Sequence, residues 1–253
     1  MLVAPPEVDF LEIFPENYLF TEGLPRYQLA QIAERFPITV HAIGMSVGST
    51  DPPDMDYLRR LRKLVQDLKA PILSDHLCWN GVGGLNLHSV LPIPLSEAAL
   101  QHVTEKVKQL QGFFGRRICL ENSPGYMAWK SSTMSEVEFL CRLCEAADCG
   151  ILLDLNNLFQ AAYNYGFDAI QYLDALPVGR IGHQHVGGHA NEGRFLLDTH
   201  EAPVVPAVWE LYRYMEARTG GVTTVMEWDN KLPALGVLVA EAQKAREYQC
   251  QKT

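Results

Sequence analysis

Residues 152–157 read Leu-Leu-Asp-Leu-Asn-Asn, a short apolar run that ends in the polar residues Asp154 and Asn156. Apolar runs of this length are typical of buried parallel strands. Six more runs also end in His, Asp or Glu, at residues 13–17, 39–41, 73–76, 119–122, 182–185 and 225–229. Barrels of the α/β class place their chemistry at the carboxyl ends of such strands. The recurrence therefore predicts an α/β barrel whose mouth carries metal ligands.

The segments between these runs carry helical periodicity, with apolar residues at intervals of three and four. The predicted helices cover residues 55–68, 96–114 and 208–215, and two more follow Asp168 and Pro233. Strands and helices alternate at the spacing of βα units, which form parallel sheets. No linker or low-complexity stretch interrupts this order. Residues 1–253 are therefore predicted to form a single metal-binding α/β-barrel domain.

The composition argues against several classes of protein. The chain has 253 residues, of which 47% are hydrophobic, and a formal net charge of -9. A nucleic-acid groove needs a basic stripe, which this acidic balance disfavours. No apolar stretch is long enough to span a bilayer, and residues 1–10 lack the basic and apolar regions of a signal peptide. We expect a cytoplasmic protein that binds neither membrane nor nucleic acid.

The six cysteines include Cys141, Cys144 and Cys149. The spacing of the first two fits a zinc or iron–sulfur site, but no second pair completes such a site. Ser135 and Glu138 form a capping box that starts a helix here, and Cys141 and Cys144 then fall on its apolar face. We therefore interpret them as small buried hydrophobic residues.

Two long connections are rich in glycine and proline. They run from about Leu77 to Leu95, including Gly81-Val82-Gly83-Gly84, and from Val186 to Val204. Both follow predicted strands, so both are expected at the barrel mouth, and loops of this length are usually functional. The glycine-rich stretch opens no helix, so it is interpreted as a flexible loop and not as a phosphate-binding loop.

The ends of the runs offer a set of potential metal ligands. They are His41, His76, Glu121, Asp154, His185 and Glu227, and the second long connection adds Asp198 and His200. Neutral imidazole together with carboxylate suits Fe, Mn, Zn or Co. So many groups exceed one tetrahedral site, which favours two or three metals that share bridging carboxylates. Taken singly, each group also has a simpler interpretation: Asp154 could cap the next helix, and Glu16 could organise a turn.

Eight segments that carry His, Asp, Glu or Asn residues follow one another along the chain. They are Pro15-Glu16-Asn17-Tyr18, His41 to Ser46, Ser74-Asp75-His76-Leu77, Leu120-Glu121-Asn122, residues 152–157, His185 to His189, Asp198-Thr199-His200 and Glu227-Trp228-Asp229. Together they cover nearly the whole chain. In this order the chain resembles the multinuclear non-haem iron-dependent oxidative enzymes. These methanobactin-biosynthesis oxidase-like proteins were long known only as an uncharacterised protein family.

The resemblance implies a xylose-isomerase-like TIM barrel with two or three irons at its mouth. Members of that family use O₂ to modify ribosomally made peptides, often at cysteine, and often with a partner protein that presents the peptide. Carried over by motif, the implied ligands are His41, His76, Glu121, Asp154, His185 and Glu227 for a central metal pair, and Asn156, Asp198 and His200 for a third metal. Asp75 and Glu121 are the implied catalytic residues, with Glu121 as a bridge. The ligands themselves also permit Zn or Mn.

The chain departs from the family pattern in two places. Relatives usually begin with a glycine-rich strand that carries an Arg and a His, and this chain starts almost at the segment that follows it. We therefore expect seven strands instead of eight, with open edges near Val8–Phe14 and Val222–Met226. His183 stands where relatives often carry an acid, so the surroundings of His185 are expected to differ.

Two other functions stay open on the sequence alone. A divalent-metal sugar isomerase or a phosphodiesterase could use the same scaffold, because a fold does not determine a function. Against these, no Lys lies at a strand end to polarise a sugar carbonyl, and the acidic balance disfavours DNA. A barrel that has lost a strand could also be a degenerate, non-catalytic scaffold, although all the candidate ligands are present.

Overall fold

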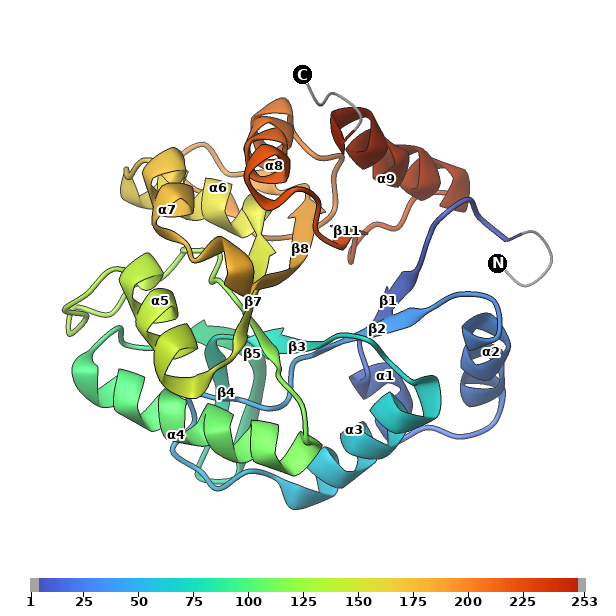
Figure 1. The fold of residues 1–253 in the computed structure, drawn as a ribbon, viewed down its shortest axis with the longest axis horizontal. Coiled ribbons are helices and arrows are strands. Elements are labelled where there is room, and N and C mark those ends of the chain that lie inside the picture. The colour runs from blue at the N-terminus through green and yellow to red at the C-terminus, as the bar shows by residue number, and fades with distance from the viewer. Residues whose placement is uncertain (1–4, 250–253) are drawn as a thin grey trace.

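The computed structural model describes residues 5–249, and its core is a seven-stranded parallel sheet with the order β1-β2-β3-β6-β7-β8-β11. The strands are β1 (Leu11–Ile13), β2 (Ile38–Ala42), β3 (Leu73–His76), β6 (Cys119–Glu121), β7 (Gly150–Asp154), β8 (Ile181–Gly187) and β11 (Thr224–Glu227). The sheet curls into a nearly closed barrel with the helices around its outside (Figure 1). Each strand overlaps one of the seven runs, which confirms the predicted α/β barrel.

Helices connect the strands along the outside of the barrel. They are α1 (Glu16–Leu19), α2 (Leu24–Ala33), α3 (Met55–Leu68), α4 (Glu97–Phe114), α5 (Glu136–Ala147), α6 (Leu155–Tyr165), α7 (Ala169–Ala175), α8 (Pro206–Thr219) and α9 (Leu235–Gln249), with a short 3-10 helix at Val178–Arg180. Side chains of Asp54, Ser96 and Asp168 cap α3, α4 and α7. Over the described residues, no helix is both long and apolar enough to cross a membrane.

Three helices, α1, α2 and α6, have no counterpart in the sequence prediction. Helix α2 buries only Leu29, so it carries little apolar periodicity. Helix α6 begins directly after β7, so the polar residues of the candidate ligand motif occupy its first turn. Helix α5 begins at the predicted cap, where Ser135 accepts a hydrogen bond from the Glu138 N–H at 3.3 Å.

The two long connections contain hairpins. Strands β4 (Cys78–Val82) and β5 (Leu85–Pro92) pair antiparallel, and so do β9 (Ala190–Asn191) and β10 (Leu196–Leu197). Gly83 and Gly84 turn the first hairpin at φ values of 64° and 76°, which glycine adopts without strain. Both of their N–H groups donate to the Asp51 carboxylate at 2.9 Å. The prediction of a flexible glycine loop was wrong, because these bonds and the hairpin ladder order the turn.

The barrel is open between β1 and β11, the two ends of the sheet, which do not pair with each other. All residues of β2 and β7 are buried, whereas all of β1 and three of the four residues of β11 are only half-buried. Helix α9 lies beside this opening (Figure 1). The predicted seven strands and their open edges are therefore confirmed.

Candidate metal centre

Imidazole and carboxylate groups converge at the carboxyl ends of three neighbouring strands. Glu121 ends β6, and its Oε2 atom lies 3.0 Å from His41 Nε2 and 3.3 Å from His76 Nε2. His41 lies on β2 and His76 ends β3. Parallel pairing places these strand ends at one edge of the sheet. A single carboxylate oxygen therefore lies between two imidazole nitrogens.

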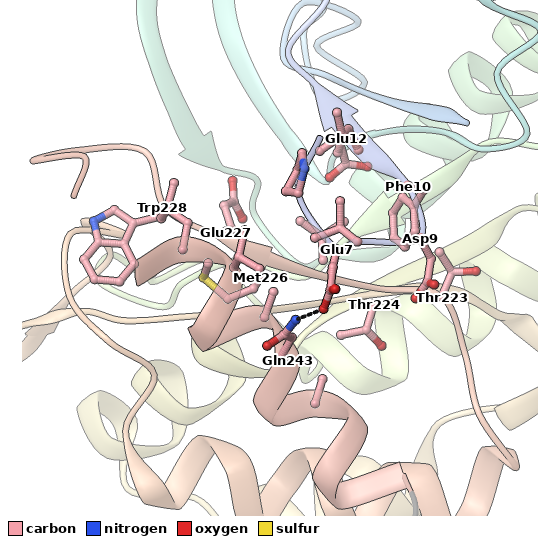
Figure 2. Close-up of a pocket in the computed structure, with 18 of the residues that line it drawn as sticks. Glu7, Asp9, Phe10, Glu12, Thr223, Thr224, Met226, Glu227, Trp228 and Gln243 are labelled. Carbon is pink, nitrogen blue, oxygen red and sulfur yellow. Dashed lines mark hydrogen bonds between the residues drawn. The ribbon is translucent and has the colours of Figure 1, made fainter. Parts of the chain in front are cut away.

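One imidazole connects the two edge strands. His185, on β8, has its Nε2 atom 2.7 Å from Glu12 Oε1 and its Nδ1 atom 2.9 Å from Glu227 Oε2. Glu12 belongs to β1 and Glu227 ends β11, so the two carboxylates come from opposite sides of the opening (Figure 2). Glu12 Oε2 also lies 2.9 Å from Nε2 of His183. The His185 side chain is completely buried within this group.

His200 gathers a third group of carboxylates. Its Nε2 atom lies 2.9 Å from Asp198 Oδ1 and 3.8 Å from Asp154 Oδ2, and its Nδ1 atom lies 3.1 Å from Asp229 Oδ2. The His200 backbone has a φ of 42°, which is costly outside glycine and needs support from its surroundings. A Cβ atom at Gly187 would lie 2.7 Å from His200 Cδ2, so glycine permits this close packing.

The packing of these atoms fits bound metal ions. The ligand atoms lie within 4.8 Å of one another in four groups: Glu12-His183-His185, His41-Glu121-His185, Asp154-His185-Glu227 and His200-Glu227-Asp229. Several of the atoms are buried without a well-formed hydrogen bond, namely His41 Nε2, Glu121 Oε2, Asp154 Oδ2, both nitrogens of His185, His200 Nε2 and Glu227 Oε2. Unsatisfied buried polar atoms are costly. These ligand atoms lie close to one another but without hydrogen-bond geometry. Metal ions bound between them would satisfy them.

The buried carboxylates raise the pKa of two of the buried histidines, His41 and His185. Burial lowers the pKa of His41, but the Glu121 carboxylate outweighs this effect and raises the pKa to about 9. Burial also disfavours charge on His185, yet Glu12 and Glu227 hold its pKa well above the usual range. Burial, followed by the charge of Glu121, raises the pKa of Asp154 to about 7. Metal ions bind neutral imidazole, so loading would release protons from this centre.

Neighbouring side chains orient the ligand groups. Ser74 Oγ lies 2.9 Å from His41 Nδ1, which leaves Nε2 to face Glu121. Asn157 donates from Nδ2 to Glu121 Oε1 at 2.9 Å, and its backbone N–H donates to Asp154 Oδ1 at 2.7 Å. The predicted helix cap at Asp154 is thus present, and its Oδ2 atom still faces the centre. Such partners fix the direction of ligand atoms.

Glu136 supports the same end of the barrel from α5. Its Oε1 atom accepts the Ser123 N–H at 2.8 Å, and its Oε2 atom accepts the Tyr172 hydroxyl at 2.9 Å. Burial raises the pKa of Glu136 to about 7. The folded chain therefore binds a proton at this carboxyl more tightly than the unfolded chain does.

Replacing Glu136 by Gln is expected to change how stability depends on pH. Because the pKa of Glu136 is raised in the folded chain, its protonated carboxyl stabilises the fold. This contribution is complete below the unfolded pKa of 4.5 and is lost as the pH rises through about 7. As the pH rises from about 5 to about 8, the free energy of unfolding of the Gln variant should therefore decrease by about 2 kcal/mol less than that of the parent. Urea unfolding measures this. Glu145→Gln, on the exposed side of α5, is the control, and equal pH dependence in all three proteins would contradict the prediction.

Asp75 belongs to none of the ligand groups. It is fully buried, and its oxygens accept the backbone N–H groups of Met45 at 2.8 Å and His76 at 2.6 Å. Burial raises its pKa well above the usual range. Side chains alternate along a strand, so Asp75 faces away from the side that Ser74 and His76 share. Its catalytic role stays a prediction.

Asn156 lies beside the His200 group. Its Nδ2 atom donates to Asp198 Oδ1 at 3.4 Å, and its Oδ1 atom lies 2.8 Å from His189 Nδ1. Gln160 Nε2 donates to the same Asp198 oxygen at 3.2 Å. The structure thus brings Asn156 to Asp198 as the resemblance implies, while its role as a ligand stays a prediction.

The sequence pattern missed Glu12. The first run offered only Glu16, which was expected to organise a turn; it does so by accepting hydrogen bonds from Tyr57 and from two backbone amides. Glu12 lies between Leu11 and Ile13 in a strand of only three residues. A carboxylate between two apolar strand residues is the signal that could have identified it, because such a side chain is costly unless it is paired.

Replacing Glu12 by Gln is expected to weaken metal binding. Gln keeps the size but removes the charge that holds the His185 ring, and carboxylate partners of ligand histidines contribute about 10–100-fold in metal affinity. Competition against a chromogenic chelator should show a loss of this size. Glu7→Gln changes an exposed acid of the same segment and should leave the affinity unchanged. An unaltered affinity in Glu12→Gln would rule out this role.

Comparison with known proteins identifies a family. A family model described as the RiPP precursor modification enzymes MbnB, TglH and ChrH matches residues 1–250. A UPF0276 protein of Acaryochloris marina is 43% identical over 251 residues, which cover 99% of this chain and 91% of the relative. A UPF0276 protein of Caulobacter vibrioides is 40% identical over 241 residues, with 95% and 86% coverage.

Solved structures share the fold at low sequence identity. A xylose isomerase domain containing protein of Salmonella typhimurium has a TM-score of 0.67 at 12% identity, covering 97% of this chain and 89% of that chain. Endonuclease IV of Thermus thermophilus has a TM-score of 0.62 at 15% identity, with 95% and 89% coverage. These similarities concern the fold alone, and they confirm the expected xylose-isomerase-like TIM barrel.

Proposed function

The chain belongs to the family of RiPP precursor modification enzymes, and from this membership we propose that it holds a multinuclear iron centre and uses O₂ to modify a ribosomally made peptide, with cysteine as the favoured target. The observation that carries the metal proposal is the convergence of buried imidazole and carboxylate atoms at one barrel mouth. No cysteine joins these groups within residues 5–249. This donor set suits iron and also allows Zn or Mn.

The assignment of the ligands follows the family motifs, and the contacts described above support it. We assign the central pair to His41, His76, Glu121, Asp154, His185 and Glu227, and a third position to Asn156, Asp198 and His200. A bridging role for Glu121 is supported by the two imidazoles within 3.3 Å of one of its oxygens. Glu12 and Asp229 complete the surroundings. Bound iron would supply the redox chemistry that a reaction with O₂ requires.

The exposure of the ligand groups defines the side from which a peptide can approach. His41 and Glu121 are nearly inaccessible, with 1% and 2% of their side chains exposed. On the other side of the centre, 17% of His76, 20% of Asp198 and 33% of Asp229 is exposed. A peptide side chain would therefore reach the centre past the last three residues, while the buried groups exclude water behind it.

The contacts at the mouth support catalytic roles for Asp75 and Glu121. Asp75 would act by fixing the backbone of His76, whose N–H it accepts, and Glu121 would act at the metal pair itself.

The β4–β5 hairpin exposes three apolar side chains, those of Val82, Leu85 and Leu87, to 47%, 64% and 42%. An apolar surface of this kind supports the proposal of a partner protein that presents the peptide.

Elemental analysis of protein purified without air, and without affinity-tag metal, tests the proposal. About two or more irons per chain, together with an O₂-dependent mass change in a cysteine-containing peptide encoded beside the gene, is the expected result. Zinc or manganese with little iron would instead favour a hydrolase or isomerase on this barrel. A chain that binds no metal would favour a non-catalytic scaffold.

A further inference from the structure

A cavity of about 510 Å³ lies between the loop of residues 122–135 and helices α5, α6 and α7. These three helices adjoin one another on one side of the barrel (Figure 1). Four of the side chains that line the cavity are large, apolar and exposed to between 38% and 48%, namely those of Met127, Trp129, Tyr165 and Phe167. A cavity of this size with mostly apolar walls is typical of a ligand-binding site.

The loop of residues 122–135 is held in place by its own contacts. Trp129 donates from Nε1 to the Pro92 carbonyl oxygen at 2.6 Å. Gly125 has a φ of 68°, and a Cβ atom there would lie 2.5 Å from Ala161 Cβ, so glycine lets the loop pack directly against α6. The cavity is therefore formed without a ligand, which reduces the entropy cost of binding one.

The cavity adjoins the metal centre on its accessible side. Leu77 and Ser123 line the cavity, and they follow the ligands His76 and Glu121 by one and two residues. His76 is one of the groups exposed at the mouth. Successive Cα atoms lie about 3.8 Å apart, so a peptide that places one side chain at the centre can place another, about one to three residues away, in this cavity.

The charged groups of the cavity are acidic. Glu136 and Asp168 line it, and none of the described residues that line it is Lys, Arg or His. Each oxygen of Glu136 accepts one hydrogen bond, from the Ser123 N–H and from the Tyr172 hydroxyl. A carboxylate oxygen can accept two, so one acceptor position remains on each. Two adjacent acceptor positions fit the parallel N–H groups of a guanidinium.

The aromatic walls also favour a cation on an apolar stem. Trp129, Tyr165, Phe167 and Tyr172 all line the cavity, and the last two rings stack with their centroids 6.0 Å apart. Aromatic faces attract cations, and the carbon chain of Lys or Arg packs on apolar surface while its charged end stays with a polar partner.

We propose that this cavity binds a basic side chain of the peptide substrate, Arg above all, about one to three residues from the residue that is modified, an inference that rests on the peptide-modifying function proposed above. The guanidinium pairs with the Glu136 carboxylate, and its stem lies against the aromatic walls. A neutral side chain can fill the same space, but it would leave the carboxylate without an opposite charge.

Binding of matched peptides to the iron-loaded protein without O₂ tests the proposal. The probes are short fluorescein-labelled Gly-Ser peptides that carry one Cys and one Arg, about one to three residues apart in either direction. Each has a twin in which citrulline replaces Arg, because citrulline keeps the shape and lacks the charge. At the best spacing, the Arg peptide should bind about tenfold more tightly than its twin, measured by fluorescence anisotropy.

Two pairs of variants connect this preference with the cavity. Glu136→Gln should remove the preference for Arg and change the affinity for the citrulline peptide by less than about twofold. Tyr165→Ala should weaken binding of the Arg peptide about fivefold. The controls, Glu138→Gln and Tyr163→Ala, each remove the same kind of side chain from the same helix but outside the cavity, and should stay within about twofold of the parent.

NMR of the methionine methyl groups provides a test that needs no variant. The Arg peptide should shift the signals of Met127 and Met134, which line the cavity, and leave that of Met55 on α3 unchanged. No shift of the first two signals, equal affinity of the Arg and citrulline peptides at every spacing, or a preference that survives in Glu136→Gln would overturn the basic pocket.

The basic pocket and the proposed function can fail separately. The proposed function would survive the loss of the pocket if the protein still held iron and modified a cysteine-containing peptide. Conversely, Arg-dependent binding to a chain that takes up no iron would keep the pocket and refute the iron chemistry.

Discussion

Replacing Glu121 by Gln is expected to abolish metal loading at the central pair. Gln has nearly the same shape, so the hydrogen bond that Asn157 donates can persist, but an amide NH₂ in place of Oε2 cannot bind a metal ion. His41 and His76 would both lose the carboxylate oxygen that lies within 3.3 Å of each. Iron content should fall by about two ions per chain, and peptide modification by about a thousandfold or more.

Elemental analysis of anaerobically purified protein and mass spectrometry of the peptide measure these two effects. Glu145→Gln removes a carboxylate from the exposed side of α5 and should keep full iron content and activity. In metal-free protein, Glu121→Gln also removes the group that raises the pKa of His41 to about 9, so His41 should titrate at lower pH by NMR. Full iron content in Glu121→Gln would refute the assignment of the pair.

Replacing His200 by Gly is expected to remove the third metal and leave the central pair occupied. His200 approaches Asp198, Asp154, Asp229 and, at 3.6 Å, Glu227, but it does not contact the bridging Glu121, so its loss should not disturb the bridge. Glycine adopts the φ of 42° without strain, so the effect can be attributed to the lost imidazole. Iron content should fall by about one ion per chain and peptide modification by about a hundredfold.

Lys231→Gly is the matched control for the backbone. Lys231 also has a positive φ, of 48°, and its side chain is 75% exposed, outside the metal centre. This variant should retain the iron content and activity of the parent. A His200→Gly protein with unchanged iron would show that Asp198 and Asn156 hold the third metal without an imidazole, or that no third metal binds.

The parts of the fold that depend on local chemistry could be predicted from the sequence. The apolar runs identify the strands of the barrel, and polar side chains such as Ser96 mark helix starts, because each signal lies within a few neighbouring residues. The hairpin turn at Gly83 could not be predicted, since it depends on bonds to Asp51, which lies 32 residues away. The assignment of residues 1–253 to one domain stays a prediction.

The sequence predicted which residues form the candidate site better than it predicted the contacts between them. Strand alternation has two possible phases, and the sequence does not say which phase faces the barrel interior. His76 and Asp75 were therefore both candidates, and only the structure shows that Asp75 contacts backbone amides. Glu12 was missed because a three-residue strand contains too little alternation to establish a phase. The roles of all these groups as metal ligands stay predictions.

The contacts of His185 with Glu12 and Glu227 have a consequence for turnover of the protein. These contacts join the first strand of the sheet to the last, across roughly 215 residues of chain, where no backbone pairing does so. A metal ion bound here would act as a cross-link over a very long loop, and its binding to the folded chain would stabilise it by mass action. Without metal, both ends of the sheet should separate more often and become accessible to proteases. The amount of this protein in a cell is therefore expected to follow the supply of its metal.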